Sequence, residues 1–75
     1  MAKAAKRLVT CIANYGHEVS LERRKIYVAL ADSQADKLGM LRVIDESGSD
    51  YLYPKVSFVA ATLPQPIRRA VLEAA

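Results

Sequence analysis

Short runs of apolar residues, separated by polar turns, recur along this chain and predict a β-rich protein. Val, Ile and Tyr are frequent in these runs, and these residue types favour extended strands. We therefore expect five strands, at residues 8–13, 26–31, 41–44, 51–53 and 58–61. In the second run, Ile26, Val28 and Leu30 share one face at the period of two that strands impose. We expect this face to point into the core.

The third and fourth runs predict a hairpin. An acidic Ser/Gly segment at residues 45–50 separates them, and Ser, Asp and Gly favour tight turns. Pro54 ends the fourth run, because proline has no N–H to donate to a strand ladder. Phe58 then resumes the extended pattern. We place Phe58 in the core, together with one face of the strand that carries Tyr51 and Tyr53.

Two helical segments are expected outside the strands. Residues 32–39 predict a single helical turn inserted in a loop, with Ser33 as its N-cap and Gly39 at its end. Pro66 favours the first turn of a short C-terminal helix within residues 64–75. The apolar residues of this helix recur at spacings of three and four and form one stripe: Ile67, Ala70, Val71 and Ala74.

The length of 75 residues is that of one small domain. We divide it into a flexible leader at 1–6, a β domain at 7–63 and the helix at 64–75. No apolar window is long enough to span a bilayer, and the run after the leader is too short for a signal peptide, so we expect no membrane association. Cys11 is the only cysteine, which excludes an internal disulfide and indicates a reducing, cytoplasmic setting.

The sequence contains no residue pattern that predicts catalysis or cofactor binding. His17 is the only histidine, so a zinc site made with Cys11 would need two carboxylates as well. A Cys/His nucleophile pair would need a third, orienting group. The carboxylates of residues 45–50 lack the alternating oxygen ligands of a calcium loop. We therefore expect a protein that is not an enzyme and that has no metal and no cofactor.

The net charge of +3 leaves nucleic acid open as a partner. Lys3, Lys6 and Arg7 account for this excess, because eight basic and eight acidic residues balance in the rest of the chain. The candidate contacts for RNA or DNA are Arg23, Arg24, Lys25, Arg68 and Arg69. Convergence of these five cations on one face would favour nucleic acid, and their dispersal would favour a protein partner.

Several segments resemble those of Src-homology type 3 domains. Residues 19–26 are similar to the diverging turn of that family, and residues 41–54 to its distal hairpin and tyrosine-isoleucine-proline stop. Phe58 and Val59 are similar to its closing tyrosine-valine pair. The resemblance covers about residues 13–63. It implies a mainly β fold: a five-stranded SH3-like barrel with a one-turn helical insertion and a short C-terminal helix.

The peptide-binding residues of that family are matched only in part. Its groove needs a tryptophan, but this chain has none, and Met40 or Leu41 stands in that region. Its acidic loop is shortened here, so the resemblance does not imply polyproline recognition. Aromatic positions beside the family's groove nevertheless predict an exposed shelf for a protein partner. The residues of this shelf are Tyr15, Tyr53 and Pro54.

Overall fold

The computed structural model describes residues 6–74 and contains five strands, two helices and one 3-10 turn. In chain order these are β1 (Lys6–Cys11), β2 (Ile26–Leu30), α1 (Ser33–Lys37), β3 (Met40–Ile44), β4 (Asp50–Pro54), η1 (Lys55–Ser57), β5 (Phe58–Ala60) and α2 (Gln65–Ala74). The expected mainly β class, with a helical insertion and a C-terminal helix, is confirmed. The predicted flexible leader lies outside the described residues except for Lys6, which begins β1.

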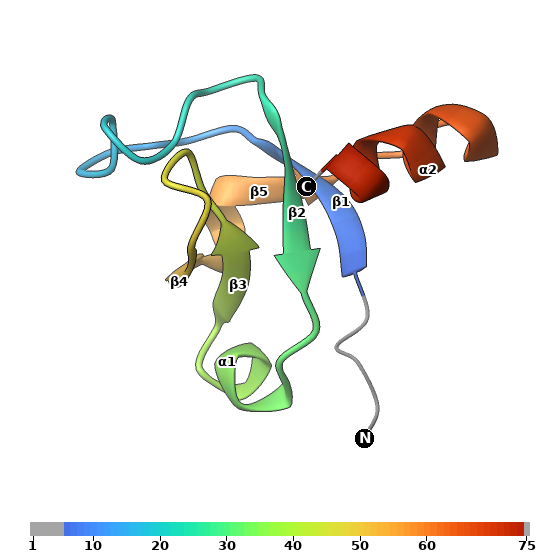
Figure 1. Cartoon of the computed structure of the whole chain (residues 1–75). Helices are drawn as coiled ribbons and strands as arrows, with labels where there is room; N and C mark the ends of the chain where they lie inside the picture. The colour runs from blue at the N-terminus through green and yellow to red at the C-terminus, as the bar shows by residue number, and fades with distance from the viewer. Residues whose placement is uncertain (1–5, 75) are drawn as a thin grey trace.

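All five strands join one antiparallel sheet in the order β4-β3-β2-β1-β5. The sheet bends around its core, and β5 lies across the direction of β2 and β3 (Figure 1). No ladder joins β4 to β5 among the described residues, so the closed barrel that we expected is not observed. Pro54 contributes to this opening, because it ends β4 without an N–H and the chain then turns through η1.

The β3–β4 hairpin has the predicted turn. The Asp45 N–H donates to the Ser49 carbonyl at 3.1 Å, and the Gly48 N–H donates to the Asp45 carbonyl at 3.0 Å. Gly48 has φ of 84°, a left-handed conformation that suits glycine and creates the bulge typical of three-residue hairpin loops. Ser47 donates from both its N–H and its hydroxyl to the Asp45 carboxylate. These local bonds fix the register of β3 on β4.

The main core uses the opposite face of β2 from the one we predicted. Tyr27 and Ala29 are buried in it, whereas Ile26 and Leu30 are half-buried outside it. The core residues are Val9, Cys11, Leu21, Tyr27, Ala29, Leu41, Val43, Tyr53 and Phe58. The Tyr27 hydroxyl reaches the sheet margin, where it donates to the Glu46 carboxylate at 2.6 Å. A tyrosine therefore fits this face, because its ring is buried and its hydroxyl is bonded.

Helix α2 packs on the outer face of the sheet. Leu8 and Val28 are direct neighbours in the β1–β2 register on this face, and both are buried although neither belongs to the main core. Val71 of α2 lines the same hollow as Val28. The predicted apolar stripe is wrong in part, since Ile67 and Ala70 are exposed. The half-buried residues of α2 are Arg68, Val71 and Leu72.

The N-cap of helix α1 lies one residue earlier than we predicted. Asp32, not Ser33, is the N-cap, and its carboxylate accepts hydrogen bonds from the N–H groups of Gln34 and Ala35. The same carboxylate also pairs with Arg42 of β3 at 2.8 Å, which ties the insertion to the sheet. Neither helix in the described part of the chain is long and apolar enough to cross a membrane.

Candidate functional site

The structure does not assemble the predicted shelf. The side chain of Tyr53 is only 4% exposed and belongs to the core, so the prediction that it is exposed is wrong. Its hydroxyl donates to the Asp45 carboxylate, and the ring of His17 packs edge-on against it with centroids 5.0 Å apart. Pro54 is half-buried, and Tyr15 is 86% exposed. Of the three predicted residues, only Tyr15 presents a free ring to solvent.

Tyr15 projects from the loop between β1 and β2, residues 12–25, which is ordered by its own hydrogen bonds. The Leu21 N–H donates to the His17 carbonyl at 2.8 Å, and the Asn14 amide donates to the Leu21 carbonyl at 3.0 Å. Leu21 is buried and anchors the loop in the core. Tyr15 and Val19 are both more than 80% exposed on this loop. The loop therefore holds two large apolar side chains in water on a fixed backbone.

Two further apolar side chains are exposed, one in η1 and one on a segment bonded to it. Val56 in η1 is 84% exposed, and Leu38, at the end of α1, is 72% exposed. The Lys55 N–H donates to the Gly39 carbonyl at 3.0 Å, which joins η1 to the chain beside Leu38. We define the η1 face by its four residues, Tyr15, Leu38, Pro54 and Val56.

Backbone hydrogen bonds bring the segments of the η1 face together. On one side of η1, the Ile12 N–H donates to the Ser57 carbonyl at 2.8 Å, close in the chain to Tyr15. On the other side, Lys55 pairs with Asp36 of α1. Sequence reasoning missed Leu38 and Val56, because each is a single apolar residue between polar neighbours and has no periodic pattern.

The five predicted cations lie on two segments of the chain, and one of them is paired with an acid. Lys25 pairs with Glu46 at 2.6 Å and lies over the Tyr27 ring, 5.8 Å from its centroid. The Glu46 side chain raises the pKa of Lys25, and its bond to Lys25 lowers the pKa of Glu46. Arg23 and Arg24 lie on the turn before β2, whereas Arg68 and Arg69 lie on α2 (Figure 1).

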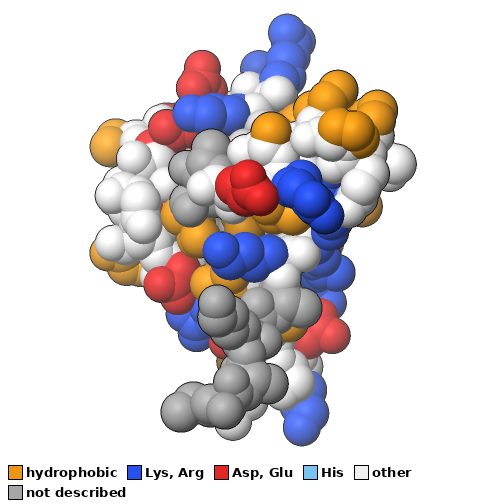
Figure 2. Space-filling view, turned by 45° about the vertical axis from the view of Figure 1, so that its right-hand side comes forward, with side chains coloured by type: hydrophobic (Ala, Val, Ile, Leu, Met, Phe, Trp, Pro, Cys, Tyr) orange, Lys and Arg blue, Asp and Glu red, His pale blue; other side chains and the backbone are white. Residues whose placement is uncertain are grey.

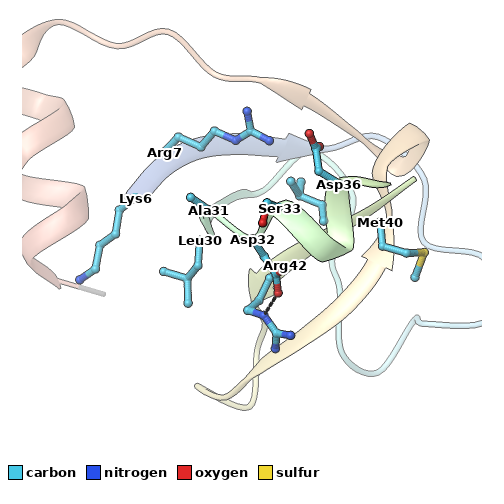
Figure 3. A pocket seen from close by; sticks show the side chains of 10 residues that line it. Lys6, Arg7, Leu30, Ala31, Asp32, Ser33, Asp36, Met40 and Arg42 are labelled. Atoms are coloured by element: carbon cyan, nitrogen blue, oxygen red, sulfur yellow. Dashed lines mark hydrogen bonds and ion pairs between the residues drawn. The ribbon is translucent and has the colours of Figure 1, made fainter. Parts of the chain in front are cut away.

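Lys and Arg side chains nevertheless follow one side of the molecule below α2 (Figure 2). A hollow of about 380 Å³ there lies between the start of β1, α1 and β3, with Lys6 and Arg7 in its wall. Figure 3 shows Arg7 extending toward Asp36 and Arg42 paired with Asp32. Arg42 is bound by Asp50 as well, at 2.9 Å. In this hollow Arg42 is therefore neutralised, whereas Lys6 and Arg7 take part in none of the ion pairs among residues 6–74.

The histidine, the cysteine and the buried carboxylate of the described residues all lie in packed or hydrogen-bonded surroundings. Within residues 6–74, no three His, Cys, Asp or Glu side chains meet as metal ligands would. Burial raises the pKa of the Cys11 thiol, so it is a packed side chain and not a ready nucleophile. Asp45 is buried, and burial alone would raise its pKa. The hydrogen bonds from Ser47 and Tyr53 outweigh burial and hold the pKa of Asp45 below its usual range.

Comparison with known proteins adds no assignment. The chain matches no protein-family model, and neither curated proteins nor solved structures include a significant match. The candidate site is therefore argued from the exposed side chains and the geometry alone.

Proposed function

We propose that this protein is a non-enzymatic interaction module that binds a protein partner through the η1 face. The observation that carries the proposal is the exposure of three large apolar side chains, Tyr15, Leu38 and Val56, on segments joined around η1. Large apolar side chains that stay in water on adjoining segments are candidates for cover by a partner. Burying each of these side chains contributes about 1.5–3 kcal/mol to binding before the costs of association.

We further propose that the module is a small barrel of the Src-homology type 3 kind. Three features support this: the strand order, the long loop between β1 and β2, and the 3-10 turn between β4 and β5. They agree with what the sequence resemblance implies. The chain has no tryptophan, however, and its exposed residues at η1 are aliphatic. We therefore expect an apolar partner segment and not a polyproline helix.

The surroundings of the η1 face suit a protein partner. The nearby Lys55–Asp36 pair is neutral as a unit, so the rim of the face favours neither a polyanion nor a polycation. A largely apolar centre with a polar rim is the common composition of protein interfaces. The alternative, binding of RNA or DNA, has less support because Lys25 is paired with Glu46 and the other four cations lie on two different segments, the turn before β2 and α2.

The proposal predicts which substitutions abolish partner capture. Full-length protein carrying Tyr15→Ala, Leu38→Asp or Val56→Asp should recover about tenfold less partner from lysate of the source organism, because each change removes buried apolar contact. Tyr51→Ala is the matched control, since Tyr51 is an exposed aromatic residue outside the η1 face. Its recovery of partner should be unchanged. Equal recovery of the partner by all four variants would contradict the proposal that the η1 face is the binding surface.

A further inference from the structure

A further hollow, of about 310 Å³, lies at the base of the long loop and does not include the residues of the η1 face. Its walls are Thr10, Cys11, Ile12, Arg23 and Arg24. Ile12 is half exposed, and so is Val59, which lies opposite Thr10 in the β1–β5 register. The lining thus combines two arginines and a threonine with the half-exposed Ile12, and the half-exposed Val59 lies on the neighbouring strand.

The backbone holds the two arginines in place beside β1. The Cys11 N–H donates to the Lys25 carbonyl at 3.0 Å, and the Arg24 N–H donates to the Cys11 carbonyl at 2.8 Å. Arg24 has φ of 70° and is the only non-glycine residue with positive φ in the described part of the chain. Glycine adopts this conformation freely, whereas a side chain opposes it. An arginine at such a position is a strained backbone feature of the kind that concentrates at functional sites.

Neither guanidinium has an acidic partner. Within residues 6–74, the cations that form ion pairs are Lys25, Arg42 and Lys55, and neither Arg23 nor Arg24 is among them. Glu22 precedes them in the chain and contacts neither arginine in an ion pair. The positive charge of Arg23 acts on the wall of the hollow, since it opposes the rise that burial causes in the pKa of Cys11. Two arginines that form no ion pair among residues 6–74 therefore line one small hollow.

We propose that this hollow binds a single phosphoryl group carried on an apolar body, such as a phosphorylated aromatic side chain. Two adjacent guanidinium groups match the double charge and the several acceptor oxygens of a phosphomonoester better than they match one carboxylate. The apolar body would cover Ile12 and Val59. A polynucleotide fits less well, because the neighbouring Lys25 is neutralised by Glu46 and the cations do not form a continuous track.

The direct test is a titration of the full chain with phenyl phosphate at low salt, in which the amide chemical shifts are monitored by NMR. Phenyl phosphate should cause saturable shifts at Thr10, Ile12, Arg23 and Arg24. Inorganic phosphate, which lacks the apolar body, and benzoate, which carries one charge, should each bind about tenfold more weakly. A peptide containing phosphotyrosine should bind more tightly than phenyl phosphate if the ligand belongs to a protein, and no more tightly if it is a small molecule.

Two variants and one control decide between this site and general charge attraction. Arg24→Gly removes a guanidinium while leaving a residue that favours φ of 70°, so the protein should stay folded and bind phenyl phosphate at least tenfold more weakly. Arg23→Gln should weaken the binding of phenyl phosphate by a similar factor. Arg69→Gln removes one charge from α2 and should change the affinity less than twofold.

Three results would each overturn the proposal. The first is the absence of saturable shifts at the hollow with phenyl phosphate. The second is an equal loss of affinity in Arg69→Gln, which would indicate non-specific attraction of anions. The third is tighter binding of single-stranded DNA at the same phosphate concentration, with shifts that extend over α2, which would indicate a nucleic-acid surface instead.

Discussion

At the scale of single residues, Arg24 has the most clearly strained backbone conformation among the described residues. Its φ of 70° disfavours any side chain by about 1–2 kcal/mol, whereas glycine adopts it without that cost but loses more conformational entropy on folding. We therefore predict that Arg24→Gly raises the free energy of unfolding by up to about 1 kcal/mol in urea denaturation. Arg23→Gly is the control, because Arg23 does not have a positive φ, and it should give no gain. A loss of stability in Arg24→Gly would contradict the assigned conformation.

The buried pair of Tyr53 and Asp45 predicts a pH dependence. The pKa of Asp45 is held below its ordinary value, so this carboxylate stabilises the fold above about pH 4 and loses that contribution as the pH falls through its native pKa. Tyr53→Phe removes one donor to the carboxylate. This substitution should lower the free energy of unfolding by about 1–2 kcal/mol at pH 7 and by less at pH 2.

Urea unfolding at several pH values checks this prediction. Tyr51→Phe supplies the control, because the Tyr51 ring is about half exposed and its hydroxyl makes no hydrogen bond within residues 6–74. This variant should match the parent at every pH. A pH profile that is the same in Tyr53→Phe and the parent would show that the Tyr53 hydroxyl does not hold the Asp45 charge.

The contrast between these two tyrosines shows where sequence reasoning fails for single residues. Both lie on the core-facing side of β4, opposite Leu41 and Val43, so alternation alone does not separate them. Tyr53 is buried because His17 and Phe58 pack on its ring, and both come from distant segments. Tyr51 lies nearer the hairpin end and stays exposed. Only the tertiary contacts decide which ring could serve a partner.

At the scale of elements, helix α2 is the part that packing holds most weakly. It has ten residues, and helices of this length are marginal in water unless they dock on a partner surface. Val71 is half-buried and lines one hollow with Val28, whereas Ile67 is exposed. We predict that Val71→Ser lowers the free energy of unfolding by about 1–2 kcal/mol, and that the matched change Ile67→Ser alters it by less than about 0.5 kcal/mol.

Hydrogen exchange at Leu8 and Val28 complements that stability measurement. These two residues are covered on the outer face of the sheet, so undocking of α2 should speed exchange of their amides and leave those of the main core unchanged. Equal effects of Val71→Ser and Ile67→Ser on exchange would mean that α2 does not dock by the face described here.

The sequence predicts the strands and helices of this protein better than it predicts which face of each one is buried. The hairpin turn follows from Gly48 and its acidic neighbours, because few other conformations suit those residues. The inward face of β2 was predicted wrongly, since both of its faces are apolar and a period of two does not choose between them. The same ambiguity affects α2, where Leu72 lies beside the predicted stripe and packs in place of Ile67.

At the scale of the whole molecule, ion pairs neutralise three cations, and the largest apolar exposures lie on other residues. Lys25, Arg42 and Lys55 are paired with acids of the hairpin turn, of β4 and of the α1 segment. The largest apolar exposures lie on the long loop, at the end of α1 and at η1. The long loop also carries Arg23 and Arg24, so the proposed η1 face and the proposed arginine hollow both involve this loop. The exposed residues of the η1 face were not predictable beyond Tyr15, because folding alone brings them together.

Site-specific photocrosslinking in cells of the source organism tests the central claim most directly. A photoreactive phenylalanine placed at Val56 should give a discrete adduct with a protein, and the additional change Leu38→Asp should abolish that adduct. The same probe at Tyr51 should give none. Adducts of equal yield at both positions, adducts that nuclease removes, or no adduct at Val56 would contradict binding of a protein partner through the η1 face.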